Sequence, residues 1–171
     1  MKVEVVPHRL EWRREFEQES DQIAIALNDI LVAVHHIGST AIPSIYAKPI
    51  IDILVEVKTI TLVDKHRSTM EKLGYEAMGE FGIAGRRYFR KGNRIGVRTH
   101  HVHVFTQGSL EVTRHLAFRD YMIAHPEIAQ QYSELKRCLA QSHPTDIELY
   151  MDGKDGFIKE MEHRALELYL C

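Results

Sequence analysis

The sequence feature that most constrains the fold is a pair of apolar, β-branched runs, Leu31–Ile37 and Ile50–Val57. The second run is almost continuously apolar, which is typical of a strand at the centre of a sheet. The first run stops at Gly38, where a strand would have to turn. We therefore expect these two segments to lie in the sheet at the core of the fold.

Helical periodicity flanks this central region. The segment Arg9–Leu31 repeats apolar residues at three-, four- and seven-residue spacings, with Glu19 on the side expected to face water. Further helices are expected over Thr59–Leu73, Ser109–His125, Pro126 to about Gln141, and about Asp146 to Leu170. Gly153 and Gly156 lower the helix propensity of the first third of this last segment.

Four more segments are strand candidates: Lys2–Val6, Tyr75–Met78, Arg86–Arg90 and Ile95–Phe105. Strands in the middle and helices at the ends favour an α/β or α+β fold. We expect one mixed sheet flanked by helices and a C-terminal helical segment. The chain has 171 residues with no repeat or linker, so residues 1–171 are interpreted as one domain.

Composition excludes several classes of protein. The chain has 22 Lys+Arg against 24 Asp+Glu, a net charge of −2, which does not favour nucleic acid as the partner. Its two cysteines, Cys138 and Cys171, cannot supply a disulfide framework or a thiolate zinc site. The N-terminus lacks the features of a signal peptide, and no apolar stretch is long enough to span a membrane. A cytoplasmic protein is expected.

The segment with most chemical content is Gly38-Ser39-Thr40, followed by Asp52 on the central strand. A strand that ends in these residues and turns into a short helix exposes backbone N–H groups and two hydroxyls, which suit a phosphate. An acid on the next strand could hold Mg²⁺ bridged to the same phosphates. The alternative is an ordinary capped helix start, for which such motifs are common.

The run HIGSTAIPSIYAKPIIDILVEV resembles the signature of the GrpB-like family, an uncharacterised group of the nucleotidyltransferase fold superfamily. The segments GRRYFRK, HHVHVF, HLAFRDYMIAHPEIAQQYSELKRCLA and FIKEM resemble the family's other blocks. This resemblance extends over nearly the whole chain from Pro7 and implies a nucleotidyltransferase-like fold. The superfamily pattern is Gly-Ser followed by acid–apolar–acid on a strand, which Gly38-Ser39 and Asp52 match.

One position departs from that pattern. Leu54 stands where the superfamily's second acid is expected, and one aspartate cannot supply the usual two-metal clamp. The resemblance to the GrpB-like family includes this departure. The standard nucleotidyl-transfer mechanism therefore does not follow directly from the fold.

The densest histidine cluster is His100-His101-Val102-His103, within a strand candidate. His101 and His103 would project from one face of that strand and His100 from the other. The nucleotidyltransferase topology that the resemblance implies would place this strand near the strand of Asp52. The hypothesis is that Asp52, His101 and His103 form a remodelled catalytic centre that holds a divalent metal (Mg²⁺, Mn²⁺ or Zn²⁺) or contacts phosphate directly. The alternative is a polar strand face satisfied by its neighbours. A histidine-triad hydrolase motif would need a third alternating histidine where Phe105 stands.

Between Phe81 and Leu110 there is no acid, while six Lys and Arg residues occur. Arg86 and Arg87 are predicted to neutralise a phosphorylated ligand, against the alternative of a solvated hairpin. Lys48 and Lys154 are further candidates for phosphate contacts. The helices after Gly108 show the apolar spacing of core elements, and no chemistry is assigned to them beyond closing one side of the pocket.

Two functions remain open from the sequence. The first is a nucleotidyltransferase-like enzyme that binds a nucleotide or another phosphorylated metabolite and transfers a phosphoryl or nucleotidyl group at the Asp/His centre. The second is a non-catalytic nucleotide-binding or regulatory module. Leu54 favours the second function, and Asp52 with its paired histidines favours the first.

Overall fold

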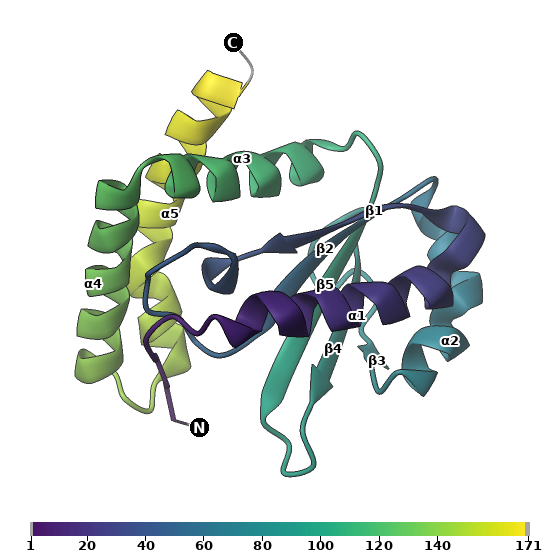
Figure 1. Ribbon diagram of the computed structural model, residues 1–171, viewed down its shortest axis with the longest axis horizontal. Helices are drawn as coiled ribbons and strands as arrows, with labels where there is room; N and C mark the ends of the chain where they lie inside the picture. The colour runs from purple at the N-terminus through teal and green to yellow at the C-terminus, as the bar shows by residue number, and fades with distance from the viewer. Residues whose placement is uncertain (1, 170–171) are drawn as a thin grey trace.

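A five-stranded mixed sheet forms the centre of the computed structural model, which describes residues 2–169 (Figure 1). The strand order is β1-β2-β5-β4-β3. β2 runs parallel to β5, and every other neighbouring pair is antiparallel. The strands are β1 (Leu31–Ile37), β2 (Ile51–Val57), β3 (Glu76–Ala77), β4 (Arg87–Gly92) and β5 (Arg98–Thr106).

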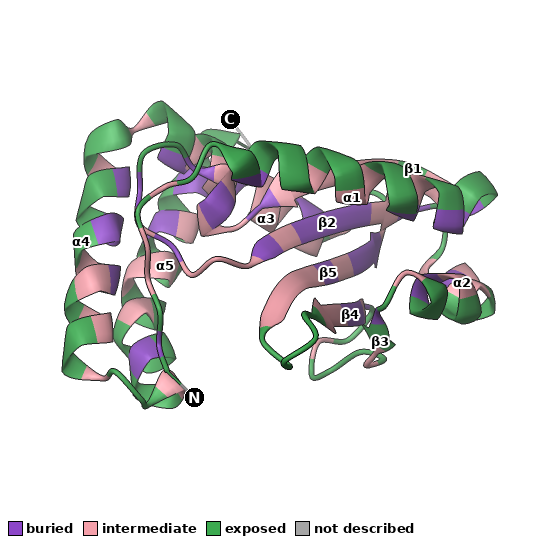
Figure 2. Ribbon diagram, turned by 60° about the horizontal axis from the view of Figure 1, so that its bottom comes forward, coloured by how far each residue is buried: buried purple, intermediate pink, exposed green. Residues whose placement is uncertain are grey.

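Helices cover both faces of β2, which is why its sequence is almost continuously apolar. Helix α1 (Glu11–Leu27) packs on one face, where Ile53 and Val55 meet Trp12 and Leu27. Helix α3 (Leu110–Ala124) covers the other face, where Val112 packs with Leu54. Figure 2 shows buried residues along most of β2 while the outer side of α1 is exposed.

The two last helices, α4 (Pro126–Ser142) and α5 (Ile147–Tyr169), lie side by side at one end of the sheet in both views (Figures 1 and 2). The short helix α2 (Arg67–Lys72) lies at the opposite end. This arrangement confirms the predicted mixed sheet flanked by helices with a helical C-terminal segment. No helix within residues 2–169 has the length and apolar character needed to cross a membrane.

Several predicted elements differ from the structure. Lys2–Val6 is not a ladder strand, because it forms only an isolated bridge between Val6 and Ala47. The predicted helix Thr59–Leu73 begins as a 3₁₀ segment, Ile60–His66, before α2. Residues 93–97 form the turn between β4 and β5, so the predicted strand Ile95–Phe105 starts later. The predicted end of the last helix at Leu170 lies outside the described residues.

Glu19 does not face water as predicted. Its carboxylate accepts a hydrogen bond from the Tyr75 hydroxyl at 2.7 Å and pairs with the Lys91 ammonium. The Glu19 side chain is 13% exposed. Helix α1 is thereby tied to the β4 side of the sheet by a half-buried polar cluster.

Candidate functional site

The parallel register of β2 and β5 places Asp52 directly opposite His101. Oδ1 of Asp52 lies 3.4 Å from Nδ1 of His101 and 3.4 Å from Nε2 of His103. His100 points to the other face, toward Glu19. The structure therefore brings together the three residues predicted as the reacting centre, on the face of the sheet that α3 covers.

Asp52 is ionised in this environment. Burial alone would raise its pKa, but the hydrogen bonds and charges of His101 and His103 outweigh burial and hold the pKa well below its usual value. A single carboxylate is thus shared between two imidazoles. The negative charge of Asp52 therefore already interacts with these two side chains.

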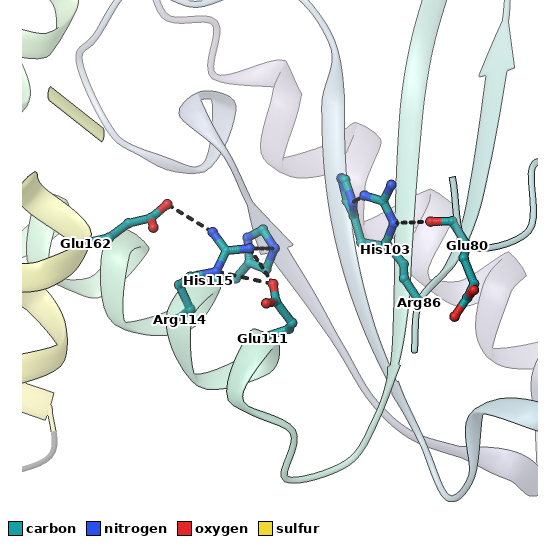
Figure 3. Close-up of polar contacts among 7 residues, drawn as sticks. All are labelled: Glu80, Arg86, His103, Glu111, Arg114, His115 and Glu162. Atoms are coloured by element: carbon teal, nitrogen blue, oxygen red, sulfur yellow. Dashed lines mark hydrogen bonds and ion pairs between the residues drawn. The ribbon is translucent and has the colours of Figure 1, made fainter. Parts of the chain in front are cut away.

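Arg86 contacts the ring nitrogen of His103 that does not face Asp52. Its buried guanidinium donates to the carbonyl oxygens of Glu80 and Phe81. Its Nη1 lies 3.3 Å from Nδ1 of His103, and Figure 3 shows the guanidinium between His103 and Glu80. A guanidinium can only donate, so Nδ1 of His103 accepts. Nε2, which faces Asp52, then carries the ring hydrogen.

A cavity of about 260 Å³ opens beside these residues. Its walls come from three parts of the chain: the segment between β1 and β2, the strands β2 and β5, and the helices α4 and α5. The lining residues are Ser39, Thr40, Lys48, Ile50, Asp52, His101, His103, Lys136, Tyr150, Met151 and Lys154.

Two polar lining residues from the helices were not predicted from the sequence. Lys136 on α4 is 1% exposed and Tyr150 on α5 is fully buried. Within residues 2–169, neither the Lys136 ammonium nitrogen nor the Tyr150 hydroxyl has a hydrogen-bond partner. The sequence did contain a signal for Lys136, because helical spacing places this lysine on the same buried stripe of α4 as Ala129 and Tyr132. A lysine on a buried stripe is unusual, since lysines are rarely buried without a partner.

The two lysines predicted to contact phosphate both reach the cavity. The Lys48 and Lys154 nitrogens lie 5.9 Å and 5.1 Å from the centre of the Tyr150 ring. Burial, with the charge of Lys48, lowers the pKa of Lys154 to about 8. Burial also lowers the pKa of Lys48, although Asp52 opposes this. Each ammonium is thus less stable than in water and gains from an anion.

The Gly38-Ser39-Thr40 segment forms one 3₁₀ turn, Ser39–Ala41, at the cavity wall. Gly38 has φ of 73°, and a Cβ there would lie 2.6 Å from Oδ2 of Asp52. The Thr40 hydroxyl lies 2.8 Å from Nε2 of His36, so Thr40 is partly engaged within the fold. Ser39 and Thr40 line the cavity, and Gly38 lets the chain pass close to Asp52.

The structure does not bring Arg86 and Arg87 to the cavity. Arg86 is committed to the contacts described above, and Arg87 pairs with Asp64 at 2.8 Å. Other cations of this acid-free segment are also paired with acids from outside it, as Arg90 with Glu76 and Lys91 with Glu19. The positive charge of the segment between Phe81 and Leu110 is therefore largely compensated by these acids.

The packing of the sheet explains why position 54 holds leucine and not the superfamily's second acid. It is fully buried on the same face as Asp52, in an apolar cluster with Ile37, Phe105 and Val112 beneath α3. A carboxylate at position 54 would be desolvated there with no partner in that cluster. Phe105, where a histidine triad would need its third histidine, belongs to the same cluster.

Metal binding requires several ligating side chains around one point. Within residues 2–169, no group of three or more His, Cys, Asp or Glu side chains is arranged to hold a metal ion. Oδ1 of Asp52 lies 3.4 Å from a ring nitrogen of each histidine, so the carboxylate already has partners. The divalent metal stays a prediction.

A separate polar cluster fixes α3 next to the site. Arg114 contacts Glu111 and Glu162, and its Nη2 lies 3.4 Å from Nε2 of His115 (Figure 3). Burial, with the charge of Arg114, lowers the pKa of His115 to about 3. The neutral His115 ring lies 5.7 Å from the ring of His103 and forms part of the support behind the cavity.

The fold and site define a mixed α/β protein with a cation-rich cavity between its sheet and its last two helices. The sequence model of the family described as GrpB protein matches residues 2–164. The chain belongs to this family. The predicted relationship to the GrpB-like family is therefore confirmed.

The UPF0157 protein YqkA of Bacillus subtilis is 47% identical over 164 residues, which are 96% of this chain and 47% of YqkA. The chain thus spans about half the length of that relative. The crystal structure of the conserved protein GrpB from Enterococcus faecalis superimposes with a TM-score of 0.93 at 47% identity, over 98% of this chain and 100% of that chain. The Cid1 poly(U) polymerase with MgGTP bound overlaps over 77% of this chain and 45% of that chain, with a TM-score of 0.49 and 11% identity.

Proposed function

We propose that the cavity binds a nucleotide or another phosphorylated metabolite, and that Asp52 with His101 forms the reacting centre beside it. The observation that carries this proposal is the pair of buried, unpartnered polar atoms on Lys136 and Tyr150 that line the cavity. Buried polar groups in folded proteins are almost always hydrogen-bonded. A ligand that accepts hydrogen bonds from both side chains would satisfy them.

The charges of the cavity favour an anion as the ligand. Its walls carry three lysines and one carboxylate, Asp52, which already contacts two imidazoles. Hydroxyls of Ser39, Thr40 and Tyr150 add further donors at the same walls. A phosphate has enough acceptor oxygens to use several ammonium and hydroxyl donors at once, which favours it over a single carboxylate.

Asp52 and His101 suit proton transfer at one wall of this anion site. The carboxylate orients the imidazole through its Nδ1, and His101 is 25% exposed at the side chain. A histidine held in this way can accept a proton from a hydroxyl or a water that attacks a phosphate. Phosphoryl or nucleotidyl transfer is the reaction class that this neighbourhood supports.

A ligand screen tests the proposal. Calorimetric titration with ATP, GTP, CTP, UTP, coenzyme A and pyrophosphate, with and without Mg²⁺, should give saturable binding for at least one compound. Lys154→Gln should weaken that binding about 10- to 100-fold, because a charge-assisted hydrogen bond contributes about 1.5–3 kcal/mol. Lys159→Gln is the matched control, since Lys159 lies on the same helix with its side chain 73% exposed.

The screen also separates the enzyme from the module. Turnover of the bound compound that Asp52→Asn abolishes would support group transfer. Binding to the wild-type protein without turnover, toward water or added hydroxyl acceptors, would identify a non-catalytic binding module. The absence of binding by every compound, or equal binding by wild type and Lys154→Gln, would contradict the proposal.

A further inference from the structure

Lys136 has an environment unlike that of the other cavity lysines. Its side chain is 1% exposed, and its nitrogen has no hydrogen-bond partner among the residues that the structure describes. The nitrogen lies over the ring of Tyr132 on the same helix, 4.5 Å from the ring centre. An aromatic face stabilises an ammonium by only about 0.5–2 kcal/mol, far less than the cost of burying a charge.

The groups that share the cavity with Lys136 offer no neutralising charge. Helix α5 contributes Lys154 and the unpartnered Tyr150 hydroxyl, and the segment before β2 contributes Lys48. The turn after β1 contributes the hydroxyls of Ser39 and Thr40, and β5 contributes the two histidines. The one carboxylate among the lining residues is Asp52, which those histidines engage. A charged Lys136 would therefore be a buried cation without a partner.

Burial and the nearby charge of Lys154 lower the pKa of Lys136 to about 6. At neutral pH the amine is then mostly uncharged. An uncharged amine is a weak partner for a phosphate, whereas an ammonium is a strong one.

We propose that Lys136 is neutral in the free protein and takes up a proton as an anion enters the cavity, so that Lys136 and Tyr150 form a proton-linked anion subsite. This inference rests on the proposed function, because it requires that the cavity bind an anion. The proton comes from the solvent and is released when the anion leaves. Binding and protonation at this subsite favour each other reciprocally.

This linkage determines whether the affinity for the anion rises or falls with pH. The bound anion raises the pKa of Lys136 above its value in the free protein. Between these two values the complex holds one more proton than the free protein, so affinity falls as pH rises, by at most tenfold per pH unit. Below about pH 6 the amine is already charged in the free protein, and its contribution to the pH dependence disappears.

Sulfate is the suitable probe, because it resembles a phosphate dianion but does not titrate near neutral pH. Calorimetric titration of sulfate at pH 7.5, in buffers of different ionisation enthalpy, measures the protons taken up on binding. The wild-type protein should take up about one proton more than Lys136→Met. Lys58→Met, at an exposed position, should match the wild type.

A second measurement does not depend on any variant being folded. The NMR titration of the lysine Cε signals in the wild-type protein should show one lysine that titrates near pH 6, and whose midpoint rises when sulfate is added. An ordinary lysine midpoint for every Cε signal in the free protein would overturn the inference. So would sulfate binding in which Lys136 stays neutral.

Failure of the proposed function gives a different pattern. If one lysine titrates near pH 6 but neither sulfate nor any compound of the ligand screen binds, the cavity is not an anion site and proton uptake on binding is excluded. If a phosphorylated compound binds with equal proton uptake in wild type and Lys136→Met, the proposed function stands and this inference is wrong.

Discussion

At Gly38 the chain passes close to the carboxylate of Asp52. The φ of Gly38, 73°, is in the left-handed region, and an added Cβ would lie 2.6 Å from Oδ2 of Asp52. Gly38→Ala should therefore displace Asp52 from His101 and His103. With ψ of −174°, this backbone conformation is essentially restricted to glycine; its strain costs another residue about 1–3 kcal/mol, and the collision adds to it. Urea unfolding should show a loss of more than 2 kcal/mol.

Gly96 provides the matched control for that prediction. It has φ of 84° but nothing within 4 Å of an added Cβ. Gly96→Ala should show the backbone cost of about 1–2 kcal/mol without any effect on anion binding. Equal losses of stability in the two variants, with binding intact in Gly38→Ala, would mean that the close approach to Asp52 has no consequence.

Among the helices, α5 carries two glycines whose surroundings differ. An added Cβ at Gly156 meets nothing within 4 Å, whereas at Gly153 it would collide with the Leu139 side chain of α4. Gly156→Ala should therefore raise the free energy of unfolding by about 0.5–1 kcal/mol, the usual helix-propensity gain. Gly153→Ala should be at least about 1 kcal/mol less stable than Gly156→Ala, because Leu139 must move.

Chemical denaturation of both variants at one pH measures this difference. The anion affinity provides a second readout, since Gly153 lies one residue before Lys154 and Gly156 lies farther along the helix. Equal stabilisation by the two substitutions would show that α4 and α5 do not need the glycine in order to approach each other.

Elements with a clear period were predictable from the sequence. The apolar stripe of α1, the runs of β1 and β2, and the helices α3, α4 and α5 all follow from spacing within one segment. The segment Lys2–Val6 alternates like a strand, but within residues 2–169 its one β-bridge joins Val6 to Ala47, and the Val3 N–H donates to the carbonyl of Pro144 instead. Pairing depends on a neighbour, which local pattern does not specify.

The same contrast between local pattern and long-range contact explains which residues of the candidate site were predicted from the sequence. Asp52, His101 and His103 could be expected to lie together because the nucleotidyltransferase topology, which the family resemblance implies, places their two strands near each other. Lys136 was missed because its helix was interpreted as core, and its partners in the cavity lie on other elements. Arg87 was assigned to phosphate, since its partner Asp64 lies 23 residues away in sequence.

The molecule as a whole carries a net charge of −2, yet its cavity collects three lysines. These lysines come from separate parts of the chain, Lys48 from the segment before β2 and the other two from α4 and α5. An anion between them would connect the sheet with the C-terminal helices. Binding energy at one small cavity would then stabilise both halves of the fold.

Mass action gives the size of this effect. A ligand at about 100 times its Kd raises the free energy of unfolding by about 2.7 kcal/mol, provided that the unfolded chain does not bind it. Sulfate also stabilises proteins in general, because it is excluded from their surfaces. The double variant Lys136→Met/Lys154→Met supplies the baseline, since it removes two of the three lysines that face the anion.

The effect of sulfate on hydrogen exchange should therefore have two components, one from binding in the cavity and one from general exclusion of sulfate from the surface. In the wild-type protein, sulfate should slow exchange locally in the 39–52 segment, in β5 and in the parts of α4 and α5 that face the cavity. The double variant should keep only a small, uniform slowing, which reflects exclusion of sulfate from the surface. Local protection confined to the sheet would mean that the anion does not bridge the helices. Equal protection in wild type and double variant would mean that the cavity lysines do not bind it.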